Sequence, residues 1–253
     1  MNFLASREKR ILVEIASHCV QSALAAQAGR ADRVELLSNP MEGGVTPSEG
    51  LIAVVRERIS IDLHVMIRPR GGDFCYSGAE LETMLHDIET AKRLGANAVV
   101  LGAVTQDGQV DVERTRELVA AARPMSVTFH RAIDVCNDLP TALNDVISCG
   151  VDRVLTSGGA ATALEGTDSL ASLVRLADHR ITVIAAGHVR AENVAGIVRR
   201  SGVGEIHAGL RSPVLVRHSM QHENISFGAG RWFETMVVQE RDVRKLVEQV
   251  EQL

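Results

Sequence analysis

The chain contains few aromatic residues and no apolar run of membrane-spanning length. Phe, Trp and Tyr together make up 3% of its 253 residues, so aliphatic side chains must fill the core, as they do in parallel sheets that are covered on both faces. No apolar run approaches the roughly 18 residues of a transmembrane helix. Residues 1–10 also lack the apolar segment of a signal peptide. We therefore expect a cytoplasmic protein without a membrane partner.

Strong basic charge and paired cysteines are absent too. The formal net charge is −5, the isoelectric point is near 6.0, and Lys and Arg form no tail or stripe. This distribution argues against a nucleic-acid partner. The cysteines are Cys19, Cys75, Cys136 and Cys149, and no two of them have C-x-x-C spacing. A structural zinc site and a disulfide framework are therefore disfavoured, and reduced thiols are expected.

Short apolar runs alternate with helical patterns along the chain. The predicted strands cover residues 11–16, 33–37, 62–67, 98–101, 126–129, 153–155, 181–185 and 205–208. The helices between them are predicted to begin near residues 20, 47, 78, 111, 140, 162 and 191, and a last helix covers residues 240–252. This alternation is typical of an α/β protein with a parallel sheet.

A recurring phrase indicates that one structural unit is repeated. The phrase occurs as GRADRVE (29–35), GANAVV (95–100), GVDRVL (150–155) and GVGEIH (202–207), each of which reads as helix end, turn and next strand. Eight strands alternating with eight helices predict a single (β/α)8 TIM barrel over residues 1–253. An open doubly wound sheet is the rival fold, although no Gly-x-Gly-x-x-Gly follows the first strand. Residues 210–232 are the least regular part and would wrap the barrel before the last helix.

Glutamates and histidines lie on the predicted strands, and function in barrels belongs at the strand ends. Glu14 and Glu35 lie on the first two strands, and two neighbouring buried carboxylates cannot both stay ionised without cations nearby. They form either an ion-pair network that closes the barrel mouth or a set of acid/base or metal-binding groups. His64, His130 and His207 lie on or just after three other strands, and we expect His130 to serve with the glutamates as a general acid/base. A Glu/Glu/His set would also favour manganese or zinc over copper(I).

The third strand ends in Arg68, Pro69 and Arg70, followed by a Gly-Gly turn and Asp73. Guanidinium groups at a strand end can bind a carboxylate or phosphate bidentately, or they can pair with structural carboxylates. The last two strands end in glycine-rich turns whose backbone N–H groups suit a phosphate. The candidates for binding an anionic ligand are Arg68, Arg70, Asp73, Arg131, Thr156, Ser157, Gly187, His207 and Gly209.

These motifs resemble those of the CutC family, long named for copper homeostasis. The resemblance covers about residues 11–230 and is carried by Glu14 and by the segments ADRVEL (31–36), EGGVTPS (42–48), IRPRGGDFCYS (67–77), VTFHRA (127–132), VLTSG (154–158) and VRAEN (189–193). It implies a TIM barrel that assembles as homo-oligomers, dimers or tetramers. It also implies a cytosolic role in copper handling, with copper(I) as the bound ion.

The chain departs from the family pattern at the positions linked to copper. The family's copper(I) site is linked to cysteines two residues after each of the two glutamates, and those positions hold Ala16 and Leu37 here. Neither side chain binds a soft ion. The remaining candidates for a copper site are the thiols of Cys19 and Cys75 and the thioether of Met66.

Two functions remain open at this point. The first is a copper homeostasis protein that binds the ion. The second is an enzyme of unassigned activity on a small anionic or phosphorylated substrate, with a divalent metal or no cofactor. A barrel that serves only as an interaction scaffold is a third reading. His218, Met220 and His222 offer a further soft set, or they belong to a solvated loop.

Overall fold

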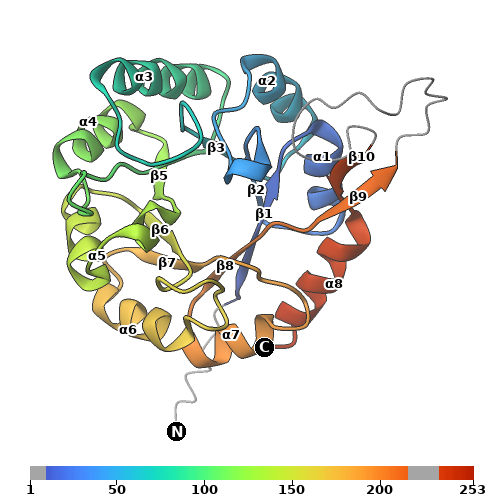
Figure 1. The fold of residues 1–253 in the computed structure, drawn as a ribbon. Helices are drawn as coiled ribbons and strands as arrows, with labels where there is room; N and C mark the ends of the chain where they lie inside the picture. Colours follow the sequence, from blue (N-terminus) through green and yellow to red (C-terminus); the bar gives the residue numbers. More distant parts are fainter. Residues whose placement is uncertain (1–9, 216–233) are drawn as a thin grey trace, which may run out of the picture.

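Eight parallel strands form a closed barrel, as the sequence predicts. The computed structural model describes residues 10–215 and 234–253. The strands follow one another around the barrel in chain order, and β8 pairs with β1 to close it (Figure 1). They are β1 (Leu12–Ser17), β2 (Arg33–Leu36), β3 (Asp62–Met66), β4 (Ala98–Leu101), β5 (Ser126–Phe129), β6 (Arg153–Thr156), β7 (Thr182–Ala185) and β8 (Glu205–Ala208). All bounds agree with the prediction to within one residue, so the TIM barrel is confirmed and the open sheet is excluded.

Among the residues described, eight α-helices surround the strands (Figure 1). They are α1 (Val20–Ala28), α2 (Glu49–Arg58), α3 (Gly78–Arg93), α4 (Val112–Ala122), α5 (Leu139–Ser148), α6 (Thr167–Ala177), α7 (Val194–Ser201) and α8 (Glu240–Val250). The short 3-10 helices η1 (Pro40–Glu42) and η2 (Arg131–Val135) follow β2 and β5. α8 packs between α7 and α1 and completes the ring. None of these helices is both long and apolar enough to cross a membrane.

Side-chain caps determine where several helices begin. Ser77 accepts the backbone N–H of Glu80, and the Glu80 carboxylate accepts the N–H of Ser77, so α3 starts at the predicted residue. α2 starts two residues later than predicted, because Ser48 is its cap. α6 starts five residues later than predicted, because Thr162 and Glu165 first close a hydrogen-bonded turn.

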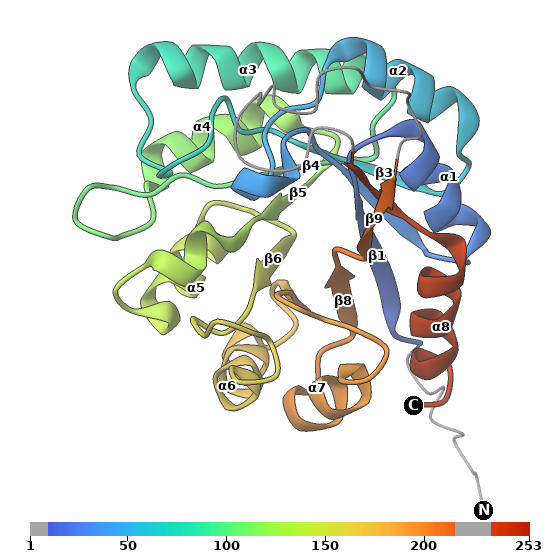
Figure 2. The same ribbon diagram turned by 45° about the vertical axis from the view of Figure 1, so that its right-hand side comes forward.

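A two-stranded hairpin replaces part of the segment that was predicted to be irregular. β9 (Arg211–Leu215) pairs antiparallel with β10 (Glu234–Val238). The hairpin lies beside α1 (Figure 2), and the Val238 N–H donates to Ser22 Oγ on that helix at 3.1 Å. The segment between the two strands, with His218, Met220 and His222, lies outside the described residues.

The barrel interior is separate from the main apolar core, which lies between the outer faces of the strands and the helices. Alternate residues of each strand point into the barrel. Ala16, Leu37, Met66 and Val100 form a buried cluster of their own, which we call the apolar layer. Three of these residues lie two positions beyond Glu14, Glu35 and His64 on the same strands. The apolar layer is therefore nearer to the barrel mouth than these polar side chains are.

Candidate functional site

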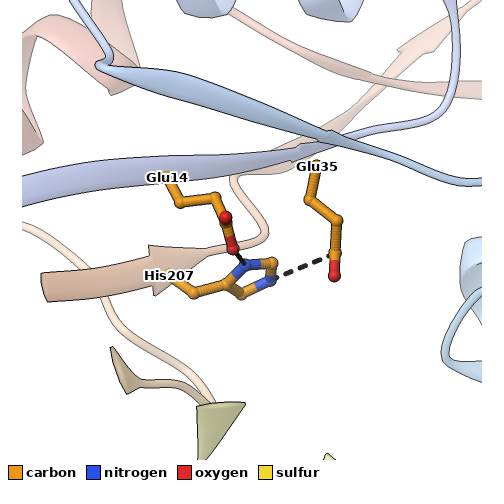
Figure 3. Close-up of side chains that lie close together, drawn as sticks. All are labelled: Glu14, Glu35 and His207. Atoms are coloured by element: carbon orange, nitrogen blue, oxygen red, sulfur yellow. Dashed lines mark hydrogen bonds and ion pairs between the residues drawn. The ribbon is translucent and has the colours of Figure 1, made fainter. Parts of the chain in front are cut away.

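Three neighbouring strands bring two glutamates and a histidine together inside the barrel (Figure 3). The strand register pairs Glu14 on β1 with His207 on β8, and Glu35 is on β2. His207 Nδ1 lies 2.7 Å from Glu14 Oε1, and His207 Nε2 lies 3.7 Å from Glu35 Oε2. Glu14 is fully buried, whereas 14% of the His207 side chain is exposed. The imidazole therefore lies between one carboxylate that it hydrogen-bonds and a second that is just beyond hydrogen-bond distance.

A buried cation holds the other oxygen of Glu14. Arg33 Nε donates to Glu14 Oε2 at 2.6 Å, and Arg33 Nη2 donates to Glu205 on β8. His64 Nδ1 also lies 3.2 Å from Glu14 Oε2. The sequence analysis missed Arg33, although its spacing of two residues from Glu35 places both side chains on the same face of β2. The glutamates thus belong to an ion-pair network, one of the two arrangements that the sequence left open.

The three groups of the site have different proton affinities. Burial would raise the pKa of Glu14, but Arg33 and the hydrogen bonds from His207 and His64 hold it well below the usual value. Burial raises the pKa of Glu35 to about 7. Burial would lower the pKa of His207, but the charges of Glu35 and Glu14 raise it above the usual value. Near neutral pH, therefore, Glu14 is ionised and a proton is available on Glu35 or His207.

His207, and not His130, is the histidine that lies between the two glutamates in the structure. His130 lies one residue beyond β5, and its ring packs against Phe74 with centroids 4.9 Å apart. Burial and the Arg68 charge lower the pKa of His130 to about 3, so its ring is neutral at physiological pH. Its Nδ1 accepts the Ala132 N–H at 3.2 Å. Alternation along the strands could not separate the two histidines, because both point inward.

The two arginines after β3 organise the loops around them. Arg68 donates to the backbone carbonyls of Glu42 and Gly44 through Nη1 and to that of Gly72 through Nη2. Arg70 donates to Glu80 in the first turn of α3 and, within its own loop, to Asp73 and the carbonyls of Gly71, Asp73 and Cys75. Arg70 and Asp73 thus pair with each other in the structure, which is the structural-carboxylate alternative of the sequence analysis.

A carboxylate fills the loop after β6, where an anionic ligand was expected. Asp134 of η2 accepts hydrogen bonds from Thr156 Oγ1, from both the N–H and the hydroxyl of Ser157, and from the Gly159 N–H. Arg131 donates to Asp134 at 2.7 Å and to Ser157 at 2.9 Å. These donors therefore bind a side chain of the protein itself. The sequence feature that could have indicated this pairing is the carboxylate of Asp134, which lies four residues after His130.

The glycines after β7 and β8 differ from each other. Gly187 has a φ of +103°, and a Cβ at this position would lie 3.2 Å from Ser157 Cβ. Glycine is therefore needed there for both backbone conformation and close packing on the β6 loop. A Cβ at Gly209 would meet no atom within 4 Å. Their predicted role in anion binding stays a prediction.

The described cysteines do not assemble a copper(I) site. Cys19 caps α1 through Sγ, which accepts the Ser22 N–H, and Cys75 lies in the loop before α3. In residues 10–215 and 234–253, the one group of three possible metal ligands is Glu14, Glu35 and His207, with ligand atoms within 4.8 Å of one another. Oxygen and imidazole ligands suit divalent ions, whereas copper(I) prefers sulfur. The ligand group found among the described residues therefore does not fit copper(I).

Comparisons with known proteins agree with the resemblance seen in the sequence. A sequence profile of the CutC family matches residues 11–212. The family protein CutC of Chromobacterium violaceum is 48% identical over 218 residues, which cover 86% of this chain and 88% of the relative. The family protein CutC of Bacteroides fragilis is 45% identical over 221 residues, which cover 87% of this chain and 88% of the relative.

Solved structures agree with these sequence matches. A crystal structure of a Streptococcus agalactiae protein, named provisionally as the copper homeostasis protein CutC, superposes with a TM-score of 0.75 and 33% identity, over 78% of this chain and 97% of that one. A monomeric form of phosphoribosylanthranilate isomerase from Thermotoga maritima superposes with a TM-score of 0.58 at 12% identity, which shows a shared fold alone. Because the family profile matches most of the chain and a relative at 48% identity covers 86% of it, the chain belongs to the CutC family.

Proposed function

We propose that the chain is an enzyme that transfers protons to and from a small substrate inside its barrel, with Glu35 and His207 as acid and base. One observation carries the proposal: the His207 ring lies between Glu14, which stays ionised, and Glu35, whose pKa is raised to about 7. Neighbouring groups whose surroundings separate their pKa values are typical of acid–base pairs in enzymes. A group with a pKa near 7 is suited to proton transfer at neutral pH.

Each residue of the group has a distinct task in this proposal. Glu14 accepts the Nδ1 hydrogen of His207 and fixes the ring, which leaves Nε2 to exchange a proton. Arg33 keeps Glu14 ionised. Because His207 Nε2 and Glu35 Oε2 are 3.7 Å apart, neither group is committed to a hydrogen bond with the other. A substrate oxygen or an acidic C–H next to a carbonyl can then exchange a proton with either group.

A divalent metal ion at the same place is a second candidate, favoured by the short separations among the ligand atoms of Glu14, Glu35 and His207. Carboxylate and imidazole ligands suit manganese, zinc or copper(II). Both Glu14 oxygens are already bonded, to Arg33 and His207. Such an ion would therefore use Glu35 and His207 Nε2, with Glu14 supporting the imidazole. Copper handling by this chain would then involve the divalent ion.

Histidine NMR tests the acid–base proposal directly. In protein labelled at histidine, the pKa of His207 should fall in the Glu35→Gln variant, because the glutamine removes a negative charge that raises it. Glu57→Gln on the exposed side of α2 is the matched control and should leave the His207 pKa unchanged. An unchanged His207 pKa in Glu35→Gln would show that the two groups are not coupled, and the proposal would fail.

Exchange of solvent deuterium tests the chemistry. The protein is incubated in D2O with a panel of small carboxylates, sugars and phosphorylated compounds, and deuterium uptake is read by mass spectrometry. At least one compound should gain deuterium, and Glu35→Gln should slow that uptake by roughly 100-fold or more. Uptake that proceeds equally in Glu35→Gln and Glu57→Gln would contradict the assignment of Glu35.

Metal analysis separates the two candidates. Elemental analysis of the purified chain is combined with chelator-competition titrations of zinc, copper(II) and, anaerobically, copper(I). A divalent ion bound once per chain and lost in Glu35→Gln would favour the metal candidate. Copper(I) that is lost in Cys19→Ser and Cys75→Ser would instead favour the thiol site implied by the family resemblance. The acid–base proposal expects neither ion to bind tightly.

We propose in addition that the chain works in the cytoplasm as a homo-oligomer, a dimer or a tetramer. The support is the family resemblance in the sequence. Light scattering coupled to size-exclusion chromatography gives the mass directly, and a monomer at micromolar concentration would contradict the proposal. Fractionation of cells that express the tagged chain tests its location.

A further inference from the structure

A buried cation at the end of β3 has no carboxylate partner in the part of the chain that the structure describes. The Arg68 residue is 3% exposed, and none of the ion pairs among the described residues involves it. Its guanidinium has five N–H groups, and three of them donate to backbone carbonyls. Its Nε has no hydrogen-bond partner in the described structure. A buried charge without a counter-ion is costly, so the position favours an anion from outside the chain.

A second unused donor lies close to this cation. His130 is 4% exposed, and its Nδ1 accepts the Ala132 N–H, so the neutral ring carries its hydrogen on Nε2. That Nε2 has no partner among the residues described. A Cβ at Gly102 would come within 2.6 Å of the His130 ring, so the glycine is required for this ring position. A neutral imidazole that donates from a buried site is a known way to stabilise negative charge on oxygen.

The aromatic residues of the next loop connect the two donors. The Phe74 ring lies under the Arg68 guanidinium, with Cζ 4.7 Å from the ring centroid, and it also contacts His130. Tyr76 is 3% exposed, and its hydroxyl finds no hydrogen-bond partner of good geometry in the described part of the chain. Burial raises the pKa of Tyr76 to about 12 despite the Arg68 charge nearby, so the hydroxyl keeps its proton and can donate it.

We propose that Arg68, Tyr76 and His130 form a site for an oxyanion, a carboxylate or phosphate group of a small molecule, at the C-terminal ends of β3 and β5. The site offers one cation and three donor groups that the described chain leaves unused. Of the arginines predicted to bind an anion, this assigns the task to Arg68 and not to Arg70, whose donors serve its own loop. The site adds two residues to Arg68. Tyr76 was not predicted from the sequence, and His130 was expected to be an acid or base.

The inference deepens the proposed function and rests on it for one point, that the bound oxyanion belongs to the substrate. Arg68 lies four residues beyond His64 and two beyond the end of β3, so it is nearer to the barrel mouth. For a substrate anchored by its oxyanion at the mouth to reach Glu35 and His207, its other end has to pass the buried apolar layer. The substrate class is then a small, elongated carboxylate or phosphate ester.

Titration with inorganic phosphate and with acetate tests the site without knowledge of the substrate. Calorimetry gives the affinity, and NMR of labelled histidine follows the His130 and His207 rings separately. Tyr76→Phe removes only a hydroxyl that has no hydrogen-bond partner of good geometry among the described residues, so the fold should be kept. We expect it to weaken binding of the preferred anion about tenfold. Thr115→Val, which removes another buried hydroxyl without a partner, on α4, is the matched control and should leave binding unchanged.

The outcomes separate this site from the acid–base group. Phosphate or acetate that shifts the His130 resonances, with weaker binding in Tyr76→Phe, supports the site, and the tighter of the two anions identifies the substrate group. If neither anion shifts His130, or if Tyr76→Phe and Thr115→Val bind alike, the inference is overturned. In that case a His207 pKa that still falls in Glu35→Gln leaves the proposed function standing.

Discussion

Replacing Glu35 by glutamine should change how the stability of the barrel depends on pH. Burial raises the pKa of this carboxyl group from 4.5 to about 7. Between those two values the folded protein holds a proton that the unfolded chain has released. Stability therefore falls as the pH rises through this window, and the loss is complete above about pH 7. Glutamine is similar in size and cannot ionise, so it should remove this contribution.

The magnitude follows from the width of the window. Each pH unit is worth about 1.4 kcal/mol, so a carboxyl group with these two pKa values costs about 3 kcal/mol when it is ionised in the fold. His207 acts in the same direction, because its raised pKa stabilises the folded state at low pH and this benefit is lost as the pH rises. Glu35→Gln should thus match the parent near pH 4.5 and exceed it by about 3 kcal/mol at pH 8.

Thermal unfolding followed by circular dichroism at pH 4.5 and pH 8 provides the assay. For a chain of this length, a difference of about 3 kcal/mol corresponds to roughly 6–12 °C in Tm. Glu57→Gln on the exposed surface of α2 is the control for an ordinary change from carboxylate to amide. If Glu35→Gln and Glu57→Gln show the same dependence of Tm on pH as the parent, the argument from the buried carboxyl group is refuted.

Two further substitutions test the packing of the site by urea unfolding at pH 7. Arg33→Met removes the arginine that pairs with Glu14 and leaves Glu205 with Arg153 as its cation, and it should cost about 3–5 kcal/mol. Arg30→Met breaks an exposed ion pair and should cost less than about 1 kcal/mol. Equal losses would contradict the burial argument. Gly102→Ala should cost about 1–3 kcal/mol, because its Cβ would overlap the His130 ring. Gly50→Ala, which meets nothing within 4 Å on α2, should be neutral or stabilising, and a loss as large as that of Gly102→Ala would show that packing is not the cause.

The barrel could be read from the sequence because short apolar runs mark all eight strands. Before four of them, β2, β4, β6 and β8, a glycine-containing turn such as the one before Arg153 agrees with this signal. Helix starts were less accurate where a turn precedes the cap, as at 162–165 before α6. The β9–β10 hairpin was missed because an apolar pattern over five residues with a proline, Pro213, argues against a strand, and here the two strands pair only with each other.

The sequence predicted the site only in part, because it does not show how the last strand pairs with the first or which side chains bind one another. Glu14 and Glu35 could be placed together because their strands are consecutive. The contact of Glu14 with His207 depends on the pairing of the last strand with the first, which sequence spacing alone does not give. The partners of Arg70 lie in its own loop and at the start of α3, and Asp134 reaches the β6 turn from another strand end. Whether a polar side chain binds a ligand or a neighbouring carboxylate depends on the positions of the side chains, which residue types alone do not give.

The apolar layer bears on how metal preference can diverge among related barrels. Ala16 and Leu37 belong to one buried cluster with Met66, so cysteines at those two positions would stand beside a thioether and create a soft set of ligands. The ionic group lies one layer deeper and would remain unchanged. Two substitutions in this layer would therefore provide sulfur ligands for a soft ion. Barrels with the same fold and the same glutamates can thus differ in the metal that they accept near the mouth, while Glu14, Glu35 and His207 stay the same below it.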